Sequence, residues 1–338
     1  MNRRRFLYFL SSLTAASLCV PSVSSLVPDK KSCIEKYWRD ARFRSDGRLH
    51  VGIVGVGGPG VFYLDRVAQS FNYPCKRIAI AQEMPYLRFS RAEDALLIAN
   101  DGSYPSTIRE AQLTAQDRRS DISHMASGLD VAFILTNLYG PSDQGLSSVV
   151  AEALREAGVF TVAIKPTGRE IEGYESLKSL VDVGFEVPKD VIKHEVYLPR
   201  RHSRGELICA AIAQICRTVT FSLSKSGSPG IDATELRSVL RGSGPSMMSY
   251  RNGDGVEGLL PAFDAACTSP HLGPNGVRAS RGLMVSIEAR PGIVNDEDID
   301  AIRDRMRRIA MKGARLHLNT FENESLRSDY RVTILSRG

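Results

Sequence analysis

Six residues that follow the apolar segment LHVGIV (49–54), GVGGPG (55–60), have the spacing of a phosphate-binding loop. They fit the pattern G-x-G-x-x-G, in which glycines permit a tight turn and let the backbone approach a phosphate closely. The candidate binding residues of this loop are its glycines, Gly55, Gly57, Gly58 and Gly60. Because helix N-termini offer unpaired N–H groups to anions, this chemistry requires a strand before the loop and a helix after it.

A second glycine-containing segment, YGPSDQG (139–145), also lies between an apolar run and a helical pattern. Two such loops on one sheet favour a phosphate-rich ligand. Glu83 lies 23 residues after Gly60, where a dinucleotide-binding domain places an acid for the ribose hydroxyls. An NAD(P)-dependent oxidoreductase is therefore one interpretation of the loops, and simple tight turns between strand and helix are another.

The elements expected around these loops alternate between strand and helix. Buried strands are expected at 49–54, 76–81, 130–136 and 159–164. Helices are expected after the first loop through about residue 71, over 106–117 and over 147–158. This alternation predicts an α/β fold with a parallel sheet that is covered on both faces.

The second half of the chain has a different pattern. A long helix is predicted over 205–223, where Cys209 and Cys216 fit an apolar face as core thiols. The elements predicted beyond it are helices near 232–241, 257–267 and 296–313 and strands over 282–289, 314–321 and 330–336. These elements predict a second, smaller α+β domain.

The net charge of +6 comes from the N-terminal part of the chain. Residues 1–25 and 26–48 each carry three more basic than acidic residues, so the remaining 290 residues are formally neutral. A neutral folded part argues against binding to nucleic acid. The six cysteines show no CxxC or metal-ligand spacing.

The first 25 residues have the pattern of a targeting segment. Three arginines, Arg3 to Arg5, precede an uncharged run from Phe6 to about Val20, which is the layout of an export signal of twin-arginine type. This run is shorter than the ~20 residues that span a bilayer as a helix. The other interpretation is an uncleaved membrane anchor, with the basic linker 26–48 against anionic lipid on the cytoplasmic side.

In both halves the order of motifs resembles FtsZ, the tubulin-like GTPase that polymerises at the bacterial division site. GVGGPGVFYL (55–64) is similar to the first loop of that family, and residues 130–164 are similar to its signature segment without a gap. GIDATELRSVL (230–240) is similar to its acidic loop, and the segments 282–289 and 330–338 are similar to its last strands. The resemblance covers nearly the whole family core.

The resemblance implies an FtsZ-like nucleotide-binding domain over 49–204, a central helix over 205–225 and an FtsZ-like C-terminal domain over 226–338. It implies GTP as the ligand, with Mg²⁺ as the accompanying cation. It also implies head-to-tail filaments, in which an acidic loop of the C-terminal domain reaches the nucleotide of the next subunit.

By this resemblance, Asp232 and Glu235 take the positions of the two acidic catalytic residues, which orient water and cation at the γ-phosphate. These two acids also fit a structural role, as the N-cap and a first-turn residue of a helix. The resemblance assigns nucleotide binding to four further residues: Gly140, Ser142, Gly145 and Glu172.

Several residues depart from the family pattern. Pro59 and Pro141 stand where the family has glycines, and proline has no N–H to donate to a phosphate. Asp143, at another family glycine, places a carboxylate near the phosphates, where like charges repel unless a metal intervenes. Gly230 replaces the asparagine of the acidic loop, and two arginines in YLPRRHS (197–203) replace Asn-Asp near the base. Together these departures predict weak, altered or absent GTP hydrolysis.

We therefore expect a divergent FtsZ-like GTP-binding protein that forms filaments with itself or with another FtsZ-like protein, in cell division or membrane remodelling. Its N-terminus is expected to attach it to the membrane or to direct its export. The first alternative is a non-enzymatic scaffold, exported or attached to the membrane, that kept the fold and lost nucleotide binding. The second alternative is the NAD(P)-dependent oxidoreductase.

Overall fold

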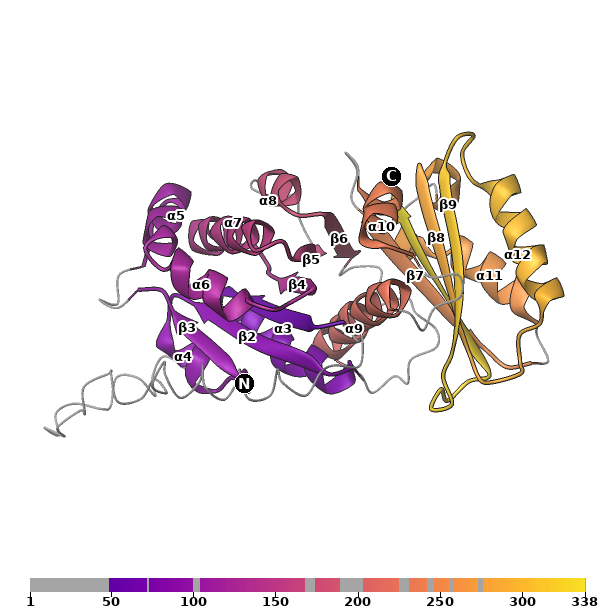
Figure 1. Cartoon of the computed structure of the whole chain (residues 1–338), viewed down its shortest axis with the longest axis horizontal. Helices are drawn as coiled ribbons and strands as arrows, with labels where there is room; N and C mark the ends of the chain where they lie inside the picture. The colour runs from indigo at the N-terminus through magenta and orange to yellow at the C-terminus, as the bar shows by residue number, and fades with distance from the viewer. Residues whose placement is uncertain are drawn as a thin grey trace, which may run out of the picture. The chain divides into compact units, whose positions relative to one another are not determined.

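A mixed β-sheet runs through the part of the chain that the structure describes (Figure 1). The structure is a computed structural model, and it describes residues 49–71, 73–99, 104–167, 174–188, 203–224, 231–241, 246–255, 258–272 and 276–337. Within these residues, ten strands lie in the order β3-β2-β1-β4-β5-β6-β7-β10-β8-β9. The predicted α/β class is confirmed.

The first six strands are parallel to one another, as the alternation of elements predicted. Their bounds are β1 Val51–Val56, β2 Cys75–Ala81, β3 Asp94–Leu97, β4 Val131–Leu135, β5 Phe160–Thr167 and β6 Val183–Pro188. Side chains of β1 alternate between the two faces of the sheet, with Ile53 in one core cluster and Val54 in the other. Both faces are therefore buried.

Helices cover both faces of this parallel part (Figure 1). The helices on the face of Ile53 are α3 Gly57–Ser70, α4 Met84–Arg88 and α9 Arg204–Leu223. The helices on the face of Val54 are α5 Ile108–Gln116, α6 Arg119–Ala126, α7 Pro141–Glu156 and α8 Tyr174–Leu180. Cys209 and Cys216 of α9 are buried in the core, which confirms their predicted place.

The remaining strands extend the same sheet with mixed pairing. β6 and β7 join through one residue pair, Phe185 and Ser246, after which β7, β10 and β8 are antiparallel and β9 is parallel to β8. The strand bounds are β7 Ser246–Gly253, β8 Gly282–Ala289, β9 Arg315–Glu322 and β10 Tyr330–Arg337.

Helices also cover both faces of this mixed part. α11 Leu259–Cys267 and α12 Asp296–Ile309 pack on one face through Phe263, Ile302 and Met306. α10 Ala233–Leu240 packs on the other face, where Leu236 and Val239 join the core cluster of α9. Two short 3₁₀ turns, η3 Pro270–Leu272 and η4 Gly276–Ala279, follow α11.

Among the described residues, the sequence did not predict three α-helices, α4, α6 and α8, three strands, β3, β6 and β7, or the 3₁₀ turns η3 and η4. β3 has four residues, of which only Leu96 is buried, so it gives almost no hydrophobic pattern. Its Asp94 forms an ion pair with Lys76 of β2, with 2.7 Å between Nζ and Oδ2. β7 is rich in polar residues and is held between β6 and β10, so its strand conformation comes from pairing rather than from its own sequence.

In the described part of the chain, one helix is long and apolar enough to cross a membrane, Gly205–Leu223 within α9. Two thirds of the apolar stretch of this helix is buried inside the protein, as in the core helix of a globular domain. The targeting segment expected over residues 1–25 and the basic linker over 26–48 lie outside the described residues.

Candidate functional site

The first glycine loop is held tightly between strand β1 and helix α3. Gly57 has a φ angle of +71°, a conformation that favours glycine. A Cβ atom added at Gly60 would collide with the carbonyl oxygen of Leu135, and one at Gly55 would lie 2.7 Å from the carbonyl oxygen of Gly60. These glycines are therefore needed to bring the first turn of α3 against β1 and β4.

The second glycine segment does not form the extended loop that the sequence predicted. Helix α7 begins at Pro141 with Gly140 as its N-cap, whereas the prediction started this helix at 147. The reason is that proline at the first helical position has a preset φ angle and loses no helical hydrogen bond. Pro141 is thus the first residue of the helix, and it has no N–H that could bind a phosphate.

Gly145 and Gly140 differ in what they accommodate. A Cβ atom at Gly145 would lie 2.5 Å from the carbonyl oxygen of Ile108, so this glycine allows α5 and α7 to pack closely. A Cβ atom at Gly140 would meet only the Tyr104 hydroxyl oxygen, at 3.8 Å. Of the two, only Gly140 faces open space, as a position that contacts a ligand would.

The two segments come together at one end of the sheet. β1 and β4 are parallel neighbours, so the N-termini of α3 and α7 follow them at the same edge. Two helix N-termini side by side attract negative charge through their free N–H groups and their dipoles. The backbone therefore has the architecture of an anion site, as the sequence predicted.

The chain places a negative charge of its own at this point. The carboxylate of Asp143, in the first turn of α7, lies against Gly57 at the start of α3. Asp143 is only 9% exposed, and no hydrogen bond from the described residues reaches its carboxylate. Burial, and secondly the nearby Glu83, raise the pKa of Asp143 from 3.8 to about 6. The carboxylate thus lies where the N-termini of α3 and α7 meet, and the expected phosphate at this place stays a prediction.

Two further side chains, which the sequence did not identify as site residues, close the site. The ring of Tyr86, in α4, covers Gly58, because a Cβ atom there would lie 2.5 Å from its Cζ. Ser142 donates a hydrogen bond to the side-chain oxygen of Gln82, and both residues are buried. Gln82 directly follows β2 at the edge where the helices begin, and that position was the signal that could have identified it.

The electrostatic surroundings of the site are acidic. Burial first, then Glu83, Tyr104 and Asp143, raise the pKa of Tyr86. Such surroundings suit a cation better than a phosphate. Within the described residues, no group of three or more His, Cys, Asp or Glu side chains is arranged to hold a metal ion. In this closed arrangement, the side chains do not fit a nucleotide phosphate unless Asp143 and Tyr86 move.

Asp232 and Glu235 lie at the start of α10 and form a capping box. The Asp232 carboxylate accepts a hydrogen bond from the backbone N–H of Glu235 at 2.7 Å, and Glu235 accepts one from the N–H of Asp232 at 3.3 Å. Both side chains are exposed, and α10 packs against β8, β9 and β10 rather than against the glycine segments. The structural role that the sequence allowed is therefore present, and the catalytic role stays a prediction.

Other residues that the sequence singled out lie outside the described residues. They are Glu172, Gly230 and the two arginines of the segment 197–203. Their assignments to the nucleotide site stay predictions.

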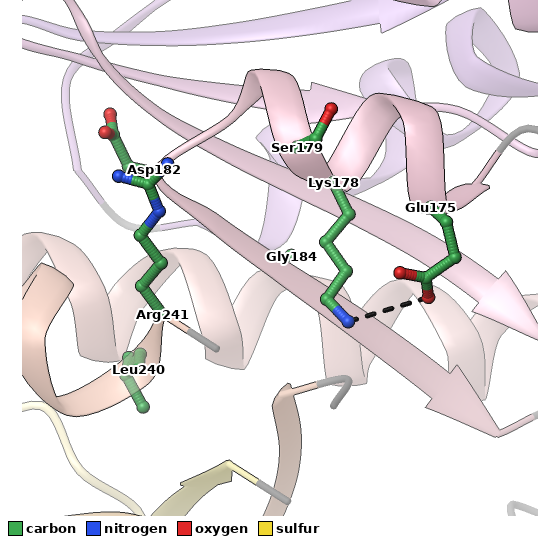
Figure 2. A pocket seen from close by; sticks show the side chains of 7 residues that line it. All are labelled: Glu175, Lys178, Ser179, Asp182, Gly184, Leu240 and Arg241. Atoms are coloured by element: carbon green, nitrogen blue, oxygen red, sulfur yellow. Dashed lines mark ion pairs between the residues drawn. The ribbon is translucent and has the colours of Figure 1, made fainter. Parts of the chain in front are cut away.

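A cavity of about 220 Å³ lies away from the glycine segments, beside α8 and the end of α10 (Figure 2). Figure 2 shows Glu175 and Lys178 of α8 at its side, with 3.6 Å between Oε1 and Nζ. This cavity does not include any residue predicted to bind nucleotide.

Sequence comparison identifies relatives of the chain, although no protein-family model matches it. The cell division protein FtsZ of Pseudomonas aeruginosa is 22% identical over 307 residues, which are 85% of this chain and 77% of that protein. Cell division protein FtsZ 1 of Halobacterium salinarum is 24% identical over 309 residues, which are 86% of this chain and 76% of that protein.

Structural comparison agrees with these matches. An FtsZ dimer of M. jannaschii matches with a TM-score of 0.71 at 18% identity, over 90% of this chain and 92% of that chain. A match of this extent includes the mixed part of the sheet, which a dinucleotide-binding Rossmann domain does not explain. The chain is a distant homologue of FtsZ and belongs to the FtsZ/tubulin superfamily.

Proposed function

We propose that this chain is a filament-forming FtsZ-like subunit that binds GTP weakly and hydrolyses it slowly or not at all. The observation that carries this proposal is the position of Asp143, whose carboxylate lies against Gly57 where two helix N-termini meet. A phosphate at this place has to displace the carboxylate or neutralise it, since two negative charges in a buried site repel each other.

Several features support weak GTP binding rather than binding of ordinary strength. Tyr86 covers Gly58, so the ring has to move before a phosphate reaches the backbone there. Pro141 offers no N–H at the start of α7. Mg²⁺ is bound in proteins by one or two carboxylates together with substrate phosphates, and Glu83, which is close enough to raise the pKa of Asp143, supplies a carboxylate of this kind. We therefore expect GTP to bind only with Mg²⁺ present.

Self-assembly is supported by family membership. The M. jannaschii structure that matches this chain is an FtsZ dimer. Head-to-tail contacts between identical subunits produce open filaments. In such a filament Asp232 and Glu235, which are exposed at the start of α10, are the residues we propose to face the nucleotide of the next subunit.

The closed site also favours a second candidate function, a scaffold that keeps the fold and binds no nucleotide. Gly55, Gly60 and Gly145 have packing roles that persist without any ligand. In that case, assembly would not depend on GTP.

The two functions are separated by one preparation of the full-length chain. GTP binding is measured by calorimetry with and without Mg²⁺, and assembly by sedimentation with GTP, with GDP and without nucleotide. Weak Mg²⁺-dependent binding with GTP-dependent pelleting supports the first function. No GTP binding, with pelleting absent or independent of nucleotide, supports the scaffold. Binding of NAD or NADP alone contradicts both.

We further propose that the N-terminal segment places the protein at the membrane or exports it. The basis is the sequence pattern alone, three arginines followed by the apolar run to Val20. Mass spectrometry of the N-terminus of the native protein tests this. Loss of about the first 25 residues supports export, and an intact N-terminus in the membrane fraction supports an anchor. An intact N-terminus in the soluble fraction contradicts both.

A further inference from the structure

A cavity of about 420 Å³ lies beside helix α9, at the end of β7 and the start of β10. Its lining is mainly polar and includes three arginines: Arg217 of α9, Arg327 of the segment before β10, and Arg331 of β10. A volume of this size is within the range of small-molecule sites, which span about 300–1,000 Å³. None of the residues assigned to nucleotide binding lines it.

A buried carboxylate fixes two of these arginines. Glu288 of β8 is 1% exposed and accepts hydrogen bonds from Nη1 of Arg217 at 3.1 Å and from Nη1 of Arg331 at 3.3 Å. Asn323 donates a further bond to Glu288 at 2.5 Å. Because Glu288 binds both guanidinium groups, their positions at the cavity are fixed before any ligand binds.

Both arginines keep donors that the described residues do not use. Arg331 donates from Nε to the side-chain oxygen of Asn252 at 2.7 Å and from Nη1 to that of Gln214 at 2.8 Å. Its Nη2 group makes no hydrogen bond with the described residues, and neither do Nε and Nη2 of Arg217. Arginine has five N–H donors in a planar fork that matches carboxylate and phosphate oxygens.

The charges around the cavity do not cancel. Arg217 and Arg331 share the single charge of Glu288, and Arg327 forms no ion pair with the described residues. Among the described residues that line the cavity, Asp254 is the one acid. These residues and Glu288 therefore carry one positive charge in excess, and burial lowers the pKa of Arg331 despite Glu288. An anion at this place would supply the missing counter-charge.

We propose that this cavity binds a small organic oxyanion, a carboxylate or a phosphate ester, through Arg217, Arg327 and Arg331. The site shares no lining residue with the glycine segments. The ligand is held by charge-assisted hydrogen bonds to guanidinium groups that Glu288 has already oriented.

The test is calorimetric titration of the full-length chain with inorganic phosphate, glycerol phosphate and succinate. At least one of these probes is expected to bind with a 1:1 stoichiometry, and the comparison of the phosphate and succinate arms identifies the class of anion. Arg327→Ala removes a cation without a described partner, and it is expected to weaken binding at least about tenfold. Arg217→Gln is expected to weaken it similarly.

The matched control is Arg278→Ala, which removes an exposed arginine of η4 that does not line the cavity. This variant is expected to bind the probes like the unchanged protein. Because Arg217 also contacts Glu288, its variant is compared with Arg327→Ala by the midpoint of urea unfolding, which Arg327→Ala should leave unchanged. Absence of binding for all three probes overturns the proposal. Equal weakening by Arg327→Ala and Arg278→Ala also overturns it, since binding would then follow net charge rather than the cavity.

Discussion

Asp143 is buried beside Gly57, and its carboxylate has no hydrogen-bond donor among the described residues. Taking a charge out of water without a partner is unfavourable, which is why the pKa of Asp143 rises to about 6. The dipoles of α3 and α7 offset part of this cost, since both helix N-termini attract negative charge. The residue resembles a bound anion that belongs to the chain itself.

The raised pKa makes stability depend on pH. The pKa of Asp143 is about 6 in the folded protein and 3.8 by its ordinary value, so the folded state holds the proton more tightly than the unfolded state. The contribution of this residue to stability is therefore most favourable below about pH 4. It falls as pH rises toward 6 and costs about 3 kcal/mol above that, following the linkage between pKa and folding.

Asp143→Asn should remove this dependence. Urea unfolding at pH 8 is expected to show a more stable variant, by up to about 3 kcal/mol, while the two proteins should differ little near pH 4. Asp117→Asn, at an exposed position after α5, is the control. It should not change the free energy of unfolding at pH 8 or near pH 4. A variant that is less stable at pH 8 than the unchanged protein would show that Asp143 makes a favourable interaction as an anion.

At the scale of the elements, the glycines are of two kinds. Some are required for a helix to pack closely on its neighbour, and Gly140 has room for a side chain. Gly60 lets α3 lie against the backbone of β4, and Gly145 lets α7 lie against α5. Gly140 borders open space. The family-like spacing of these glycines is thus explained in large part by packing, which requires no bound ligand.

Gly60→Ala is expected to destabilise the protein by about 1–3 kcal/mol, the usual cost of forcing extra atoms into a packed contact. Gly140→Ala should cost less than about 1 kcal/mol, because the added methyl group meets only the Tyr104 hydroxyl and the loss is that of a better N-cap residue. Urea unfolding of both variants measures the difference. Similar losses at the two positions would be inconsistent with the packing explanation of Gly60.

The N-terminus of α10 allows the structural role of Asp232 to be separated from a catalytic one. Asp232→Ala removes the cap and should destabilise the protein by about 1 kcal/mol, whereas Asp232→Asn keeps a capping oxygen and should not. If Asp232 also acts on GTP, Asp232→Asn should still reduce any residual hydrolysis in assembled protein. Unchanged hydrolysis in both variants would assign Asp232 a structural role alone.

At the scale of the whole molecule, the fold was predictable because its central strands are continuous apolar runs. β1, β4, β5 and β8 are each marked by such a run. β3 and β7 were missed because short or polar strands depend on their neighbours for pairing. The order of motifs over both halves indicated the superfamily, whereas the glycine loop on its own would have indicated a dinucleotide enzyme.

The state of the site was only partly predictable. The sequence indicated that Asp143 would oppose a phosphate, since a charge at a loop position has a direct physical meaning. It gave no sign that Tyr86 covers Gly58 or that Ser142 bonds Gln82, because these contacts join segments that are distant in the chain. It also placed the start of α7 too late, at 147 instead of Pro141.

We propose that Asp143 occupies the place at which the two helix N-termini would otherwise bind a nucleotide phosphate. The most direct measurement is the GTP affinity of the full-length protein and of the Pro141→Gly, Asp143→Gly variant, by calorimetry with Mg²⁺ and with the unfolding midpoint as a check on folding. Asp117→Gly is the matched control. GTP binding is expected to tighten at least about tenfold in the double variant and not in the control. Equal GTP affinity of the folded double variant and the unchanged protein would contradict it.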